Sequence, residues 1–175
     1  MHTKNIFITG KPGCGKTTLI KQIIEELNLD AGGFYTTEIR EKGIRKGFKI
    51  ITLDGKEGIL AHVNINSEYK VSKYGVDIKS LEEIGVKSIL NSLRKKVIVI
   101  DEIGKMELLS EKFKEAVLSA LDSENNVLGT IMLSHNPFTD KIKKREDTKV
   151  VYLTPENRKE VKKEIVSILY QSTFH

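Results

Sequence analysis

Residues 10–17 read Gly10-Lys11-Pro12-Gly13-Cys14-Gly15-Lys16-Thr17. They follow the β-type run Asn5-Ile6-Phe7-Ile8-Thr9 and precede a helical pattern, so a glycine-rich loop joins a strand to a helix. The pattern G-x-x-x-x-G-K-[ST] in that context indicates a phosphate-binding loop. Its glycines let successive backbone N–H groups turn toward one anion without a clash from Cβ. The stretch therefore predicts a site for the phosphates of a nucleoside triphosphate.

We expect two side chains of this loop to bind the phosphates and their metal ion. Lys16 supplies a mobile positive charge for the β- and γ-phosphates, and Thr17 offers a hard oxygen ligand to Mg²⁺. The helix that begins here adds the positive end of its dipole. We expect the following loop residues to bind the nucleotide: Gly10, Lys11, Pro12, Gly13, Cys14, Gly15, Lys16, Thr17 and Thr18.

Length, hydropathy and cysteine content narrow the class of protein. The chain has 175 residues, enough for one domain spanning residues 1–175 with a substantial core. No apolar run approaches the ~18 residues that span a bilayer, and residues 1–4 lead straight into a strand, so we expect neither membrane insertion nor a signal peptide. Cys14 is the only cysteine, which excludes an internal disulfide and fits a reducing compartment. We expect a cytoplasmic protein.

A basic charge balance suggests nucleic acid as a partner. The formal net charge is +5 and the pI is near 9.1. However, lysines mostly alternate with glutamates, as in residues 112–115 and 159–164, which is typical of solvated helix faces. The concentrated basic stretches at 94–96 and 141–145 hold no aromatic residue for base stacking. A nucleic-acid-associated ATPase therefore stays an alternative, and nucleic acid is not the expected partner.

Strand and helix patterns alternate along the chain. Residues 97–100 are wholly apolar, as in a central strand covered on both faces, and residues 127–133 and 150–153 form further apolar runs. Between about 33 and 63, β-type segments punctuated by glycine predict an inserted region of antiparallel hairpins. The expected fold is α/β, with three layers in which helices flank a mainly parallel central sheet.

Two helices are expected in the second half of the chain. Leu109, Phe113, Val117 and Leu121 recur every four residues, which predicts one buried helix stripe. Thr154-Pro155 predicts the start of the last helix, with threonine as the N-cap and proline in the first turn.

Two acids, Asp101 and Glu102, follow the apolar run at 97–100. Ligands of parallel sheets bind at the carboxyl ends of the strands, so Asp101 is placed to hold Mg²⁺ directly or through water. Neighbouring side chains of a strand point in opposite directions, so Glu102 is offset from the metal and suited to polarise a water beside the γ-phosphate. We expect both acids to contact the bound nucleotide, with Glu102 and Lys16 as catalytic residues. The expected metal ligands are Thr17 and Asp101.

Several enzyme classes share such a loop and such acids. The Asn-Lys-x-Asp motif by which GTPases read guanine is absent, and AAA+ motors carry extra helical domains that 175 residues barely accommodate. A nucleotide or small-molecule kinase remains the main alternative. Kinases must exclude water, however, and an acid dedicated to activating water would work against transfer to an acceptor.

A longer stretch that begins at the two acids points more specifically to one family. Residues 101–108 read Asp-Glu-Ile-Gly-Lys-Met-Glu-Leu, which resembles the signature of the P-loop nucleoside-triphosphatase family described from thermophiles and, in animals, as cancer-related nucleoside-triphosphatase. Other segments resemble further blocks of that family, and the resemblance covers nearly the whole chain. These segments are Gly33-Phe34-Tyr35-Thr36-x-Glu38-x-Arg40, Gly43-x-Arg45-x-Gly47-Phe48, Tyr74-x-Val76-Asp77, Leu128-Gly129-Thr130-Ile131 and Thr154-x-Glu156-Asn157-Arg158.

The resemblance implies a RecA/AAA+-like P-loop fold and Mg²⁺-dependent hydrolysis of several nucleoside triphosphates with release of phosphate. With no guanine-reading motif, we expect ATP, GTP, CTP and UTP all to be cleaved to the diphosphate. Lys105 is a further catalytic candidate that neutralises charge developing during the reaction, or else pairs with Glu107. Asn157 and Arg158 are expected to bind the nucleotide near its base. Arg40 and Arg45 flank the predicted hairpin turn, and either is a candidate for contact with the triphosphate. The run from Ser134 to His135 is assigned no role.

Overall fold

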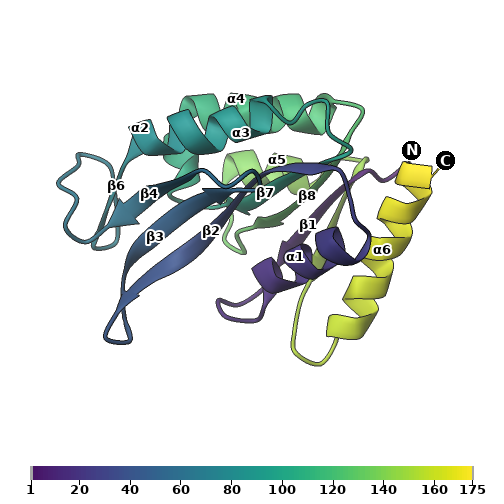
Figure 1. Cartoon of the computed structure of the whole chain (residues 1–175), viewed down its shortest axis with the longest axis horizontal. Coiled ribbons are helices and arrows are strands. Elements are labelled where there is room, and N and C mark those ends of the chain that lie inside the picture. The colour runs from purple at the N-terminus through teal and green to yellow at the C-terminus, as the bar shows by residue number, and fades with distance from the viewer. Residues whose placement is uncertain (1, 175) are drawn as a thin grey trace.

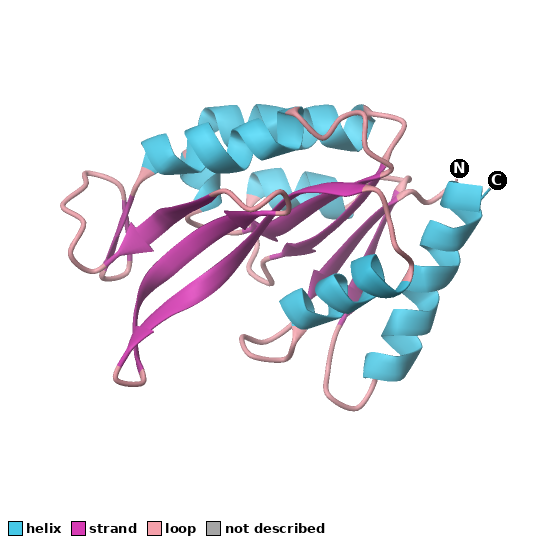
Figure 2. Ribbon diagram, in the orientation of Figure 1, coloured by secondary structure: helices cyan, strands magenta, loops and turns pink. Residues whose placement is uncertain are grey.

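The computed structural model describes residues 2–174, which form a twisted sheet with helices on both faces (Figures 1 and 2). The strand order is β5-β6-β4-β3-β2-β7-β8-β1-β9. The strands are β1 (Asn5–Thr9), β2 (Ala31–Glu41), β3 (Ile44–Thr52), β4 (Glu57–His62), β5 (Lys70–Val71), β6 (Tyr74–Val76), β7 (Val97–Ile103), β8 (Asn126–Ile131) and β9 (Thr148–Tyr152). The helices are α1 (Lys16–Glu26), α2 (Ile78–Ser80), the π-helical η1 (Leu81–Val86), α3 (Lys87–Leu90), the 3₁₀-helical η2 (Glu107–Leu109), α4 (Glu111–Asp122), α5 (Pro137–Lys143) and α6 (Arg158–Phe174).

The sheet is mixed, so the prediction of a mainly parallel sheet was wrong. Strands β2, β7, β8, β1 and β9 pair in parallel, whereas β3, β4, β6 and β5 extend the sheet by antiparallel pairing. Strand β2 belongs to both halves: residues 31–34 pair with β7 and residues 34–41 pair with β3. Short turns join antiparallel neighbours, so the chain continues from β2 by adding strands at the edge. The predicted hairpin region is thus continuous with the central sheet.

Side chains of the central strands alternate between two cores. On β1, Ile6 and Ile8 pack with α1 and α6 on one face, whereas Phe7 packs with α4 and its neighbours on the other. Figure 1 shows the same division, with α1 and α6 below the sheet and α2, α3, α4 and α5 above it. The expected helical layers on both faces are therefore present. Within residues 2–174, no helix has the length and apolar character needed to cross a membrane.

Both helix starts differ from the sequence prediction. The Ser110 hydroxyl accepts a hydrogen bond of 3.0 Å from the amide of Phe113, which caps α4 and leaves Leu109 in the preceding 3₁₀ turn with 37% of its surface exposed. Thr154 and Asn157 exchange two side chain–backbone hydrogen bonds, and α6 begins only at Arg158. In both places a local side chain–backbone contact decides where the helix begins.

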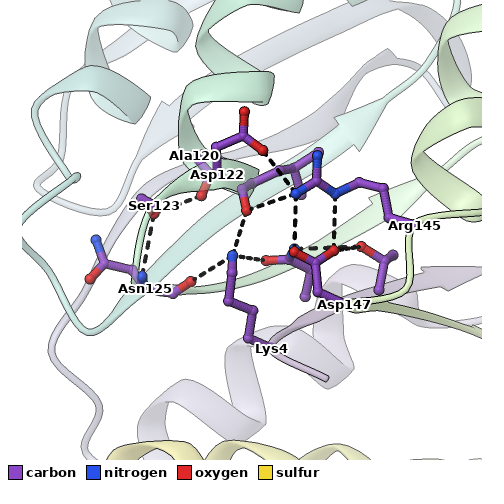
Figure 3. A network of polar contacts seen from close by, with 10 residues as sticks. Lys4, Ala120, Asp122, Ser123, Asn125, Arg145 and Asp147 are labelled. Carbon is purple, nitrogen blue, oxygen red and sulfur yellow. Dashed lines mark hydrogen bonds and ion pairs between the residues drawn. The ribbon is translucent and has the colours of Figure 1, made fainter. Parts of the chain in front are cut away.

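A polar network surrounds the amino ends of β1 and β9 (Figure 3). Arg145 pairs with Asp147 at 3.0 Å and with Asp122 at 2.9 Å. The Lys4 ammonium donates to the carbonyl of Leu121 at 2.5 Å, and burial lowers its pKa. The network joins the end of α4 to the starts of β1 and β9, which indicates a structural role.

Candidate functional site

A cleft of about 640 Å³ lies at the carboxyl ends of β1 and β7. It extends from the phosphate loop to the β2–β3 hairpin, which projects beyond the helices in Figure 1. The cleft is lined by Gly10, Pro12, Gly13, Gly15, Lys16, Thr17, Thr18, Thr36, Thr37, Glu38, Arg45, Phe48, Asp101, Glu102, Ile131, Met132, Leu133 and Ser134. The structure thus brings together the loop and the two acids, although Thr17 and Asp101 are 84 residues apart in sequence.

Backbone conformation makes the loop an anion site. Gly13 and Gly15 have φ values of 78° and 92°, in the left-handed region that favours glycine. Gly15 immediately precedes α1 and offers no side chain to cap it. The first N–H groups of α1 are therefore left for another acceptor, and a phosphate is well suited to take them.

The Lys16 side chain folds back over the loop. Its Nζ donates to the carbonyls of Gly10 at 2.9 Å and Lys11 at 3.1 Å. A phosphate oxygen would be a stronger partner than a neutral carbonyl, because hydrogen bonds between ionised groups are about twice as strong. Lys11 and Cys14 are the two predicted loop residues that do not line the cleft. Cys14 packs instead against the core beneath α1, as a small residue inside the loop.

Asp101 is buried, with 3% of its surface exposed, and two hydroxyl groups hold it. Thr17 donates to its Oδ2 at 2.5 Å, and Thr130 donates to its Oδ1 at 2.7 Å. Burial raises the pKa of Asp101, and the two hydroxyl donors oppose that shift. Thr130 lies in a segment that resembles a block of the family, but the apolar strand pattern around it predicts no role for its hydroxyl.

The pair of Thr17 and Asp101 fits Mg²⁺. A hydroxyl and a carboxylate oxygen in contact are the hard ligands that this ion takes, with phosphates and water completing its shell. Within residues 2–174, no group of three or more His, Cys, Asp or Glu side chains is arranged to hold a metal. A magnesium ion that is shared with a nucleotide does not need such a group.

Glu102 stands at the border between the cleft and a smaller pocket of about 260 Å³. The register between β7 and β8 shifts after Ile100, so the strand is irregular where the two acids lie. Burial raises the pKa of Glu102, the charge of Asp101 raises it further, and Lys16 opposes both. The side chain is thus a carboxyl group beside the loop lysine, in a place where a water can reach it.

A second buried acid, Glu107, lies close to Glu102. A Cβ added at Gly104 would lie 2.9 Å from Oε2 of Glu102 and 3.3 Å from Oε1 of Glu107, so both carboxyl groups approach the same point. Burial, followed by the charge of Glu102, holds the pKa of Glu107 well above its usual range. Lys105 is exposed and lines the smaller pocket, so the structure does not bring it to the phosphate loop.

Glu107 gives the folded protein a pH-dependent stability. Its pKa is raised from the ordinary 4.5, so the folded state binds a proton that the unfolded state releases. Stability is full below pH 4.5 and falls as the pH rises through the folded-state pKa. We expect Glu107→Gln to lose this dependence. Relative to the variant, the melting temperature of the wild type should drop by roughly 3–5 °C per pH unit within that window. Parallel melting curves from pH 4 to 8 would contradict the burial argument.

The two candidate arginines of the hairpin differ in whether they line the cleft. Arg45 lies in the cleft, where its Nε donates to Tyr74 Oη at 2.9 Å and its Nη1 to Glu38 at 3.3 Å. Arg40 pairs with the same Glu38 at 2.7 Å and donates to the carbonyl of Gly43, and it does not line the cleft.

The predicted base-side residues lie next to the loop, outside the lining of the cleft. Nη1 of Arg158 donates to the carbonyl of Gly15 at 3.1 Å, and its Nη2 donates to Gln22. The Asn157 side chain accepts from the amide of Thr154 and donates to the carbonyl of Tyr152. Arg158 is thus attached to the back of the phosphate loop, whereas Asn157 closes the turn before α6.

Comparison with known proteins identifies the family of this chain. A family model described as NTPase matches residues 5–166, which include the phosphate loop, both acids and Arg158. The chain belongs to the NTPase family. This confirms the resemblance seen in the sequence, and the chain is an enzyme of the nucleoside-triphosphatase class.

Relatives match almost end to end. The chain is 55% identical to nucleoside-triphosphatase THEP1 of a Thermotoga species (strain RQ2) over 165 residues, which cover 94% of each chain. It is 37% identical to a mouse cancer-related nucleoside-triphosphatase homolog, covering 97% of this chain and 98% of that protein. The crystal structure of THEP1 from Aquifex aeolicus superposes with a TM-score of 0.86 at 39% identity, covering 94% of this chain and 98% of that one.

Proposed function

We propose that this member of the NTPase family cleaves the bond between the β- and γ-phosphates of ATP, GTP, CTP and UTP with the help of Mg²⁺. The observation that carries the proposal is the meeting, in one cleft, of the phosphate loop, the Thr17–Asp101 pair and Glu102. Each supplies a different need of phosphoryl transfer: a cradle for the phosphates, oxygen ligands for the ion and a group that orients water.

The residues then have distinct roles. The loop N–H groups and Lys16 bind the phosphates, and Thr17 and Asp101 hold the ion, while Thr130 keeps Asp101 oriented. When bound there, Mg²⁺ supplies positive charge to the β- and γ-phosphates. Glu102 accepts a hydrogen bond from the attacking water and takes its proton as the water approaches the γ-phosphorus. The released phosphate and the nucleoside diphosphate are the products.

Weak selectivity among bases follows from the polar groups near the loop. The charged side chains that line the cleft come from the phosphate loop, the end of β7 and the β2–β3 hairpin, and Asn157 is engaged by backbone groups of its own turn. Strong discrimination between bases requires buried donors and acceptors that the wrong base leaves unpaired. We expect kcat/KM for ATP, GTP, CTP and UTP to agree within about tenfold, or ~1.4 kcal/mol. A preference beyond a hundredfold in steady-state kinetics would contradict this proposal.

The test compares the amounts of the two products that the purified protein releases. Phosphate and nucleoside diphosphate are measured for all four triphosphates, with Mg²⁺ and with excess EDTA. We expect equal amounts of the two products and loss of both in EDTA. Diphosphate in excess of phosphate, in the presence of small-molecule acceptors, would indicate a kinase, and turnover that requires added RNA would indicate a nucleic-acid-associated ATPase. Either result would overturn the proposal.

A further inference from the structure

Arg45 lines the same cleft as the phosphate loop and the two acids. On the basis of the proposed function, we infer that Arg45 is a catalytic arginine supplied by the enzyme itself, which stabilises the charge that develops on the γ-phosphoryl group. The inference rests on how Arg45 is held, on how Arg40 differs from it and on the charge of the cleft.

The guanidinium of Arg45 is held from several sides. Its Cζ lies 5.2 Å from the centre of the Phe48 ring and 5.6 Å from that of Tyr74, while Tyr74 Oη accepts from Nε at 2.9 Å. Phe48 and Tyr74 also pack edge to face at 5.4 Å. Two aromatic rings and a hydroxyl thus orient a planar, always charged group. Among the described residues, Tyr74 and Glu38 take two of its five N–H donors, which leaves the others for a ligand in the cleft.

Arg40 has the same chemistry in a different setting. It is the cross-strand partner of Arg45 in the hairpin and shares Glu38 with it. Its side chain faces the turn, where Nη1 donates to the carbonyl of Gly43 at 2.9 Å. Arg40 also holds Glu38 by two contacts of 2.7 and 2.8 Å, against the single 3.3 Å contact from Arg45. If Arg45 leaves Glu38 for a phosphate, the carboxylate keeps its closer partner.

The charge of the cleft favours such a transfer. Lys16 and Arg45 are the charged basic side chains among its described lining residues, and Glu38, Asp101 and Glu102 are the acidic ones. A triphosphate adds several negative charges, and those of the γ-phosphoryl oxygens must be stabilised in the transition state. Strand β3 lies beyond β2 and β7, on the side of Asp101 away from the phosphate loop. Arg45 therefore approaches from the hairpin side, opposite Lys16.

The experiment compares Arg45→Ala with Arg40→Ala in phosphate release from Mg·ATP. A cis arginine accounts for a difference of roughly 30-fold between related GTPases that have one and those that lack it. We expect Arg45→Ala to lose at least about 30-fold in kcat with KM changed less than about threefold, because the contact forms in the transition state. Low concentrations of guanidinium chloride should restore part of the kcat of Arg45→Ala, and equal concentrations of NaCl should not. Arg40→Ala should keep kcat within about threefold.

Two milder variants keep the inference falsifiable if Arg45→Ala does not fold. Arg45→Lys keeps a charge but loses the planar fork, and Tyr74→Phe removes only the hydroxyl that orients Nε. Both should lower kcat more than they change KM. Wild-type kcat in these variants, or in Arg45→Ala, would overturn the role of Arg45, as would an equal loss in Arg40→Ala. Lack of phosphate release by the wild type would instead refute the proposed function itself.

Discussion

Glu102→Gln is expected to bind nucleotide normally and to lose at least ~10²-fold in turnover. Glutamine keeps the size of the side chain and can still hydrogen bond to water, but its amide cannot take a proton. Because the loop and the Thr17–Asp101 pair remain intact, affinity for Mg·ATP should change less than about threefold. Single-turnover phosphate release, measured beside the binding of a fluorescent ATP analogue, separates the two effects.

A neighbouring acid supplies the matched control. Glu107→Gln makes the same replacement of a carboxyl group by an amide, at a buried side chain that approaches the same glycine but does not line the main cleft. We expect it to retain kcat within about tenfold of the wild type. Turnover close to that of the wild type in Glu102→Gln, or an equal loss in both variants, would mean that another group activates the water.

Lys16→Ala should damage binding and turnover together. Among the oxygen atoms of the described residues, the Lys16 ammonium contacts only loop carbonyls. Its positive charge is therefore available to a bound phosphate in the ground state and in the transition state alike. We expect kcat/KM to fall at least ~10²-fold, with weaker nucleotide binding accounting for at least ~10-fold of that loss.

A lysine on the same helix serves as the control for Lys16. Lys21 lies over the Tyr35 ring, with its Nζ 4.9 Å from the centroid, and does not line the cleft. Lys21→Ala should therefore leave KM within about threefold. If Lys16→Ala bound ATP as tightly as the wild type, the placement of the triphosphate on the loop would be wrong.

Local patterns predicted the parts of the site that follow directly from backbone geometry. The glycines and Lys16 occur within one strand–loop–helix unit, and Asp101 ends an apolar strand, so neighbouring residues alone indicated both. Thr130 and Tyr74 lie in segments that resemble blocks of the family, but neither was assigned a role, because each acts on a residue 29 positions away through contacts between strands. Such contacts depend on sheet order and register, which the sequence of a single strand does not contain.

The errors in the predicted fold also arise from contacts that a single segment of sequence does not reveal. Every strand pattern near residues 33–63 was visible, but the sequence did not reveal that β2 first pairs with β7 and then with β3. The predicted helix stripe held at Phe113, Val117 and Leu121, which are buried. It failed at Leu109, because the Ser110 cap starts the helix later. The spacing of hydrophobic residues predicts which face of a helix or strand is buried. Helix caps decide where a helix begins, and strand pairing decides which neighbour a strand has.

The most direct measurement is a crystal structure of the Glu102→Gln variant with ATP and Mg²⁺. The account predicts a triphosphate along residues 10–18, with the ion between Thr17 and Asp101. It also predicts a water within hydrogen-bonding distance of residue 102, in line with the bond from the γ-phosphorus to its leaving oxygen. A triphosphate bound elsewhere, or an attacking water held by a different side chain, would contradict the mechanism proposed for this cleft.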